Sequence, residues 1–180
     1  MGDVFLRRLS RWQADQYREQ LADLHGSAYE EPPGEAFDGR SRFMERLAEH
    51  AALPGFDLVV ADDGGPVGCA YGFPVTRDGG HWRGFVGPVP EELEELTAAG
   101  RVFAVAELMV LPRRRRRGIG KRLHDRLLSG TGATLAAGFL PPGAEAARSA
   151  CRAWGWQAVG RIRPPAPEPE LLVVTRPLRR

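Results

Sequence analysis

The chain has 180 residues, 43% hydrophobic and 27% charged, which is the composition of a globular protein with a sizeable core and excludes a chain disordered throughout. Its 25 Lys and Arg and 23 Asp and Glu leave a net charge of +2, so the chain is not a polycation and its basicity is local. We expect one domain over residues 1–180.

Hydrophobic periodicity and turn residues divide the first half of the chain into strands and helices. Ser10 and Gln13 have the spacing of a capping box, which predicts a helix that begins directly after the first strand. The expected elements are, in order, a strand over residues 4–9, a helix to about residue 24, a loop over 25–34, a helix over 35–51, and a hairpin of strands 56–61 and 67–75.

The second half predicts a further series of short elements around a central strand. After a surface excursion at 78–90 and a short acidic helix at 91–96, residues 102–111 are rich in β-formers and nearly free of polar side chains, as in a strand buried on both faces. Beyond residue 120 the expected elements are a helix of about three turns, a strand at 133–138, a helix at 143–154, and strands at 156–162 and 171–175.

The most informative stretch joins the central strand to the next helix through a basic turn with two glycines. Pro112 ends the strand, and Gly118 and Gly120 leave the backbone N–H groups at the helix start open to a phosphate, which the helix dipole also favours. Ile119, Leu123 and Leu127 then repeat with helical spacing. The order of strand, turn and helix predicts an anion site.

Two other phosphate-binding motifs do not fit this turn. The dinucleotide fingerprint Gly-x-Gly-x-x-Gly is incomplete, and no acidic strand end follows. A Walker A loop needs an earlier glycine and a Ser or Thr after the lysine, and Lys121 has neither.

The pattern Arg115-x-x-Gly118-x-Gly120 after Val110-Leu-Pro112 resembles the acetyl-CoA signature Arg/Gln-x-x-Gly-x-Gly/Ala of the general N-acetyltransferase (GNAT) superfamily. The resemblance implies an α/β (α+β) fold with a mixed, mostly antiparallel central sheet, flanked by helices and splayed at the cofactor site. It also implies that acetyl-CoA is the co-substrate. Its pantetheine would pair with the strand backbone, a backbone N–H near Val110 would polarise the thioester carbonyl, and its pyrophosphate would bind at the turn. The implied cofactor-binding residues are Leu108, Met109, Val110, Arg115, Arg116, Arg117, Gly118, Ile119, Gly120 and Lys121. For any single arginine, a solvent-facing position or pairing with residues 91–95 is an equal alternative.

Glu107 is the one ionisable residue of the central strand. Burying a lone carboxylate is costly, so it must be paired, exposed at a bulge, or partly neutral with a raised pKa. A raised pKa suits a general base acting directly or through water, whereas a salt bridge to an arginine is the structural alternative. The sequence leaves both open.

Cys151 stands where the resemblance leads us to expect a tyrosine, which the family often uses as general acid toward the CoA sulfur. The asparagine common a few residues earlier is Ala144. A thiol could donate the proton, although a buried cysteine is more often inert packing. Cys151 is thus a candidate catalytic residue whose identity departs from the family pattern.

The loop after the first helix borders the acceptor site in the resembling family. It carries Tyr29, Glu30 and Glu31, and carboxylates there would suit a cationic amine. We name Tyr29 and Glu31 as candidate substrate-binding residues, while a merely polar loop is the favoured alternative for each. His124, beside Asp125, is expected on its helix surface.

Cysteine usage and hydropathy bear on the cellular compartment. Cys69 and Cys151 lack the spacing of a disulfide framework or a zinc site, so we expect no metal and a reducing, cytoplasmic location. No apolar run approaches the roughly 18 residues of a membrane span. No membrane partner is therefore expected.

These features predict transfer of an acetyl group from acetyl-CoA to a primary amine of a small molecule or peptide, through a ternary complex. A catalytically weak acyl-CoA-binding or sensor module is the alternative, because Ala144 and Cys151 depart from the family pattern. A nucleic-acid partner is not expected, since the arginine run lacks interleaved aromatics. The sequence leaves a homodimer open.

Overall fold

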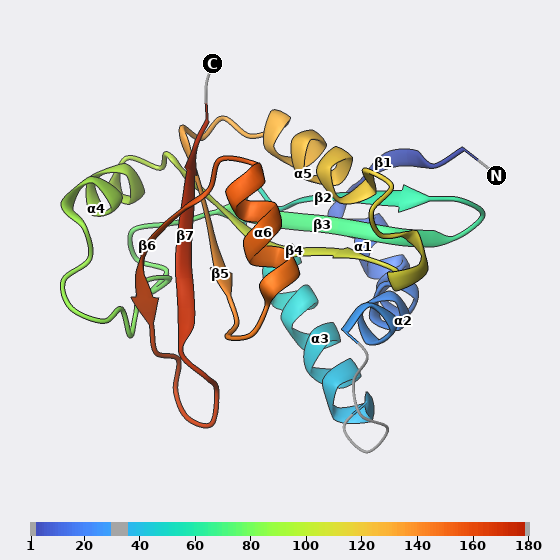
Figure 1. The fold of residues 1–180 in the computed structure, drawn as a ribbon, viewed down its shortest axis with the longest axis horizontal. Helices are drawn as coiled ribbons and strands as arrows, with labels where there is room; N and C mark the ends of the chain where they lie inside the picture. Colours follow the sequence, from blue (N-terminus) through green and yellow to red (C-terminus); the bar gives the residue numbers. More distant parts are fainter. Residues whose placement is uncertain (1–2, 30–35, 179–180) are drawn as a thin grey trace. The chain divides into compact units, whose positions relative to one another are not determined.

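The structure is a computed structural model that describes residues 3–29 and 36–178. Its chain divides into two units, one made of Met1–Phe73 with Ala106–Thr131 and the other of Pro74–Val105 with Gly132–Arg180. Strand β4 (Val102–Val110) contributes residues to both units. The described residues form seven strands whose pairing order is β1-β2-β3-β4-β5-β7-β6 (Figure 1).

Three antiparallel strands form the sheet of the first unit beside the end of β4. They are β1 (Phe5–Leu9), β2 (Asp57–Asp62) and β3 (Pro66–Pro74). The Leu111 N–H donates to the Val67 carbonyl at 2.9 Å, which ties the end of β4 to β3. Nearly every residue of β2 and β3 is buried, because helices cover both faces of these strands.

The helices of the first unit lie on opposite faces of β2 and β3 (Figure 1). The elements are α1 (Arg11–Gln16), α2 (Arg18–Tyr29), α3 (Ala36–Ala51) and α5 (Ile119–Ser129). Leu58, Val60 and Tyr71 pack with α1, α2 and α3 in one apolar cluster. On the other face Gly68 lets α5 approach, since a Cβ there would lie 3.0 Å from Leu123.

The second unit surrounds the start of β4 with β5 (Leu135–Leu140), β7 (Leu171–Pro177) and β6 (Gln157–Ile162). β5 pairs with β4 in parallel, and the β5–β7 and β6–β7 pairs are antiparallel. The parallel register covers only Val102–Ala104 with Leu135–Ala137, although both strands continue beyond it. Helices α4 (Glu91–Ala98) and α6 (Glu145–Ala153) complete the unit.

The predicted fold class is confirmed, because the sheet is mixed, mostly antiparallel and flanked by helices. The short β4–β5 register agrees with the expected splay. The capping box is also confirmed, with Ser10 Oγ accepting from Gln13 N–H and Gln13 accepting from Ser10 N–H. Among the helices that the structure describes, none is long and apolar enough to cross a membrane. The single domain over residues 1–180 stays a prediction.

The predicted loop over residues 25–34 is wrong in its first part. The first helix ends at Gln16, and after Tyr17 a second helix, α2, continues to Tyr29. Leu24 and Ala28 are buried against the sheet and His25 stacks on Phe43 of α3, and this packing keeps the segment helical despite Gly26. Residues 30–35, the rest of the predicted loop, lie outside the described residues.

Candidate active site

The turn between β4 and α5 has the geometry of an anion site. After a short 3-10 turn, Pro112–Arg114, the chain reaches Gly118, the N-cap of α5, with φ of +79° in the left-handed region that glycine adopts without strain. No side chain caps the helix, and a Cβ added at Gly118 would meet no atom within 4 Å. The start of this 11-residue helix, its positive end, thus has no side-chain cap, and the space beside Gly118 is open.

The basic residues of the turn have different surroundings. Arg114 pairs with Asp63 of the β2–β3 turn at 2.5 Å. Arg115 donates from Nε to the Val110 carbonyl at 3.1 Å and from a terminal nitrogen to the Ala28 carbonyl. Lys121 pairs with Asp125 one turn further along α5, at 2.8 Å. Arg115 thus connects the turn to β4 and α2. These contacts are structural, and an arginine that only binds phosphate would not need them.

Arg116 adopts φ of +62°, which is unusual for a residue with a side chain and costs free energy. It lies between Arg115 and Gly118 on the exposed part of the turn, and Arg117 beside it is exposed as well. Strained backbone at such a position is typical of functional loops. Arg116 and Arg117 are therefore better placed for a phosphate than Arg115.

The remaining predicted cofactor residues lie on β4 and at the start of α5. Met109, Val110 and Ile119 are buried and Leu108 is half-buried, so a ligand would meet their backbone rather than their side chains. Gly120 follows in the first turn of α5. The open left-handed glycine, the uncapped helix and the exposed arginines are the features that the phosphate-site prediction expects of this turn, and the binding roles of these residues stay a prediction.

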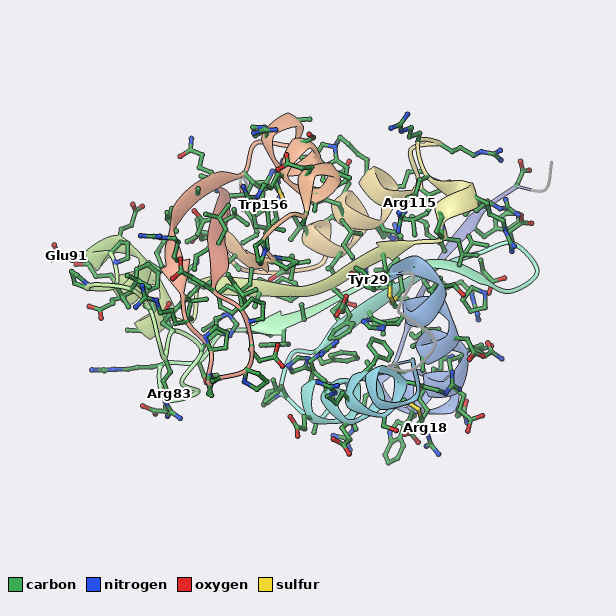
Figure 2. The ribbon with its side chains drawn as sticks, turned by 60° about the horizontal axis from the view of Figure 1, so that its bottom comes forward. Arg18, Tyr29, Arg83, Glu91, Arg115 and Trp156 are labelled. Carbon is green, nitrogen blue, oxygen red and sulfur yellow. The ribbon has the colours of Figure 1, made fainter. Side chains whose placement is uncertain are left out.

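Glu107 lies on β4 within hydrogen-bond distance of two helices of the first unit. Its Oε2 accepts from the Tyr29 hydroxyl, at the end of α2, at 3.0 Å. Its Oε1 accepts from a terminal nitrogen of Arg46, on α3, at 3.1 Å. The Glu107 side chain is 10% exposed and the Arg46 side chain 43%. Figure 2 marks Tyr29 at the end of α2 and Arg115 in the turn after β4.

The Arg46–Glu107 ion pair is surrounded by side chains whose neutral forms are favoured at pH 7. Burial raises the pKa of Glu107, and the Arg46 charge and the Tyr29 hydroxyl only partly oppose it. Burial and the Glu107 charge raise the pKa of Tyr29 well above its usual range. Burial and Arg46 lower the pKa values of His25 and His50 to about 4, so both imidazoles are neutral at pH 7.

The two alternatives left open for Glu107 are both represented in this geometry. The residue has an arginine partner, as the structural interpretation expects, and burial also raises its pKa, which is the direction that favours a general base. Arg46 was not identified from the sequence. The signal that could have found it is the spacing of Arg46 and His50, one helical turn apart on the helix that follows Tyr29.

Cys151 belongs to the second unit, on α6. It is a half-buried free thiol, and burial raises its pKa, so it is protonated at neutral pH. Ala144 is the N-cap of this helix and, lacking a polar side chain, makes no side-chain cap. A protonated thiol could donate a proton, and burial is the one influence on its pKa from the described residues. Its catalytic role stays a prediction.

Two further predicted positions can be compared with the structure. Tyr29 is described and contacts Glu107, whereas Glu31 lies outside the described residues. His124 was expected on the surface of its helix, and this expectation is wrong. Its side chain is 3% exposed and its Nδ1 lies 2.9 Å from Asp125 Oδ1, because this face of α5 packs on the sheet.

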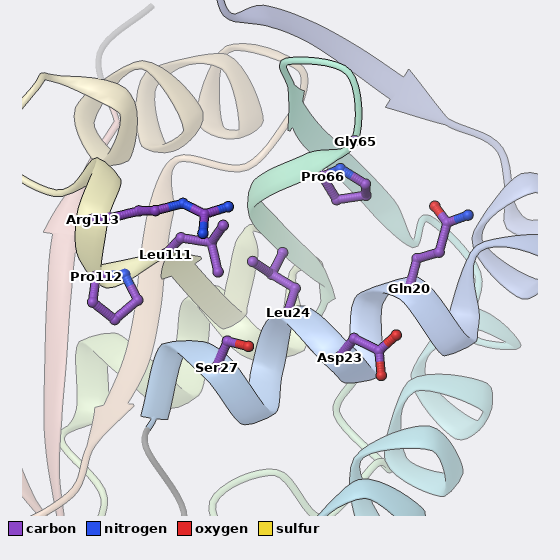
Figure 3. A pocket seen from close by; sticks show the side chains of 9 residues that line it. All are labelled: Gln20, Asp23, Leu24, Ser27, Gly65, Pro66, Leu111, Pro112 and Arg113. Atoms are coloured by element: carbon purple, nitrogen blue, oxygen red, sulfur yellow. The ribbon is translucent and has the colours of Figure 1, made fainter.

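A cavity of about 510 Å³ opens beside the phosphate turn of the first unit. Figure 3 shows side chains from three segments around it, α2, the β2–β3 turn and the end of β4. The lining residues are Gln20, Asp23, Leu24, Ser27, Gly65, Pro66, Leu111, Pro112 and Arg113. The cavity thus adjoins the start of the basic turn.

The fold and this site define a class of protein: an α/β protein in which a strand with a buried carboxylate is joined by a basic glycine turn to an uncapped helix start. The chain belongs to the acetyltransferase (GNAT) family, because the family model matches residues 8–130. The family predicted from the turn motif is thereby confirmed, and with it an acetyl-CoA-dependent acetyltransferase. No curated protein matches the chain.

Solved structures share the fold at low sequence identity. A putative GNAT acetyltransferase from Desulfovibrio desulfuricans is 18% identical, with a TM-score of 0.65 over 97% of this chain and 99% of that one. The PaiA N-acetyltransferase of Thermoplasma acidophilum, in complex with coenzyme A, is 10% identical, with a TM-score of 0.66 over 98% and 99%. The putative acetyltransferase YncA of Salmonella typhimurium, with its cofactor acetyl-CoA, is 14% identical, with a TM-score of 0.63 over 99% and 96%.

Proposed function

We propose that this protein is an N-acetyltransferase that transfers the acetyl group of acetyl-CoA to a primary amine of a small molecule or peptide within a ternary complex. The observation that carries the proposal is that β4 bears the buried Glu107 and leads directly into the open, uncapped start of α5. A candidate base and a phosphate site thus lie on one continuous segment.

The cofactor side of the site is proposed to use backbone more than side chains. The N–H groups at Gly118 to Lys121, with Arg116 and Arg117, would hold the pyrophosphate, and the β4 backbone at Leu108 to Val110 would pair with pantetheine. Acetyl-CoA, when bound, supplies an acetyl group activated as a thioester. An N–H near Val110 would stabilise the charge that develops on the carbonyl oxygen. Neighbours solved with coenzyme A or acetyl-CoA support this assignment.

The acceptor side is proposed to lie at Glu107. A primary amine is mostly protonated at neutral pH and attacks a carbonyl only after it loses a proton. The raised pKa of Glu107 brings this carboxylate closer to the pH at which a base works well, and no other acidic side chain is placed in the cluster of described residues around it. Two structural neighbours named as N-acetyltransferases support an amine acceptor.

The departing thiolate needs a proton, and Cys151 is the candidate donor because its thiol is protonated at neutral pH. Tyr29 and Glu31 are proposed to border the acceptor.

Cytoplasmic location is part of the proposal and is supported by the two free thiols, Cys69 and Cys151.

The alternative is an acyl-CoA-binding or sensor module with little turnover, favoured by Ala144 and Cys151 in place of polar groups on α6. Calorimetry with acetyl-CoA, coenzyme A and a DNA duplex, followed by an assay of thiol release with a panel of amines, separates the two. Binding of both CoA forms with amine-dependent release supports the enzyme. Binding without release on any amine supports the module, and no binding contradicts both.

A further inference from the structure

Each carboxylate oxygen of Glu107 already accepts a hydrogen bond from a neighbouring side chain. Oε1 is held by Arg46 at 3.1 Å and Oε2 by the Tyr29 hydroxyl at 3.0 Å, and the side chain is only 10% exposed. Tyr29 as a whole residue is 49% exposed at the end of α2, although its hydroxyl lies on the buried carboxylate. Tyr29 therefore presents more surface to an approaching acceptor than Glu107 does.

We propose that Tyr29 is a catalytic proton relay between the acceptor amine and Glu107, and that Arg46 is the positioning residue that holds the carboxylate for it. As the nitrogen of the neutral amine bonds to the acetyl carbon, its N–H proton moves to the Tyr29 oxygen. The Tyr29 hydroxyl proton moves at the same time to Glu107 Oε2. The bond between the acetyl carbon and the CoA sulfur then breaks, and the sulfur leaves with the bonding electrons as the CoA thiolate, so the negative charge passes from Glu107 to the sulfur. Tyr29 is again a neutral phenol after the step, and Glu107 is a neutral acid, so no charge is left on the phenol.

The other ionisable groups of the cluster are poorer proton acceptors. His25 contacts the Tyr29 ring and His50 contacts the Tyr71 hydroxyl, while Cys69 and Tyr71 interact electrostatically with Glu107. Both histidines have pKa values of about 4, and burial raises the pKa values of the Cys69 thiol and the Tyr71 phenol. Glu107 is consequently the strongest base that Tyr29 contacts.

Arg46 contributes orientation rather than proton transfer. Its guanidinium lies 5.8 Å from the Phe43 ring centroid and binds the Glu107 oxygen that Tyr29 does not use. With the carboxylate fixed by Arg46, Oε2 stays directed at the phenol. Arg46 also lowers the pKa of Glu107 against the effect of burial, which favours the ionised carboxylate that can accept a proton.

The relay rests on the proposed N-acetyltransferase function, and Tyr29→Phe tests it in the full-length protein with acetyl-CoA and a turned-over amine. We expect kcat to fall about 100-fold, the usual range for a lost acid–base group, while the affinity for acetyl-CoA is unchanged. The double variant Tyr29→Phe/Glu107→Gln should be no slower than the slower single variant, because residues that act as a unit are not additive. Tyr17→Phe is the matched control, with kcat within twofold of the wild type.

A second readout does not depend on turnover. Titration of the Glu107 carboxyl carbon by ¹³C NMR in the free protein should give a higher pKa in Tyr29→Phe and in Arg46→Met than in the wild type, because each variant removes a group that favours the carboxylate. Arg42→Met, one turn earlier on α3, should leave the pKa unchanged.

The outcomes separate the relay from the function on which it rests. A wild type that acetylates no amine overturns both. A wild type that turns over while Tyr29→Phe keeps more than half of its kcat overturns the relay alone. A double variant that loses the product of the two single effects, or a Glu107 pKa that Tyr29→Phe does not change, also overturns it.

Discussion

Arg115 is the arginine of the family signature, and its contacts predict that its substitution costs stability before it costs affinity. Its guanidinium donates to the carbonyls of Val110 and Ala28, so Arg115→Met removes two charged hydrogen bonds and leaves both carbonyls without this donor. Each such bond contributes about 1.5–3 kcal/mol, with the lower end fitting an exposed side chain, so we expect a loss of about 3 kcal/mol. For a chain of this size that corresponds to a fall in Tm of about 6–12 °C.

Thermal unfolding followed by circular dichroism measures the Tm, and calorimetry at a temperature where the variant is folded measures acetyl-CoA affinity. Arg113→Met is the control, since Arg113 is exposed in the same turn, and its Tm should stay within about 2 °C of the wild type. An unchanged Tm in Arg115→Met together with a tenfold loss of acetyl-CoA affinity would refute the reasoning, because the guanidinium would then be holding phosphate rather than carbonyls.

Three further predictions address the turn and the buried cluster. Gly118→Ala and Gly100→Ala should each lose about 1 kcal/mol of stability in urea titrations, because both glycines have positive φ and open space, but only Gly118→Ala should weaken acetyl-CoA binding in calorimetry. Gly120→Glu should abolish that binding while Gly120→Ala retains it, since the added carboxylate would oppose the pyrophosphate; unchanged affinity in a folded Gly120→Glu would contradict the phosphate assignment. The free energy of unfolding should decrease as pH falls from about 6.5 toward 4, because the unfolded chain protonates His25 and His50 in that window and the folded protein, where both pKa values are about 4, does not; the raised pKa of Glu107 acts in the opposite direction. His25→Gln should remove the His25 share of this decrease, which is at most about 3 kcal/mol, and leave the His50 share; an equally steep decrease in the variant would contradict the burial argument.

The elements predicted best are those whose signal lies in neighbouring residues. The capping box at Ser10 and Gln13 and the stripe of Ile119, Leu123 and Leu127 are both present, because capping and amphipathic spacing act within a few residues of the chain. The turn motif was recognisable for the same reason. The glycines act through their own backbone conformation and the arginines through their own charge, so the motif can be read from the residues of the turn alone.

The elements predicted wrongly are those that packing decided. Helix α2 runs on through Gly26 because Leu24 and Ala28 are buried against β2 and β3. His124 is buried although a charged residue follows it, since this face of α5 lies on the sheet. Local sequence patterns predict neither the length of α2 nor the burial of His124, because burial depends on which elements distant in the sequence pack against a helix.

The sequence by itself determined the class of this protein: a strand, a basic glycine turn and a helix whose order and residue types are enough to bind a phosphate-bearing cofactor. Only the tertiary structure decided what surrounds Glu107. Tyr29 and Arg46 lie 78 and 61 residues away from it along the chain. They reach its two oxygens because α2 and α3 pack on the same face of the sheet, and the side chains that share a buried site are selected by that packing rather than by any spacing in the sequence.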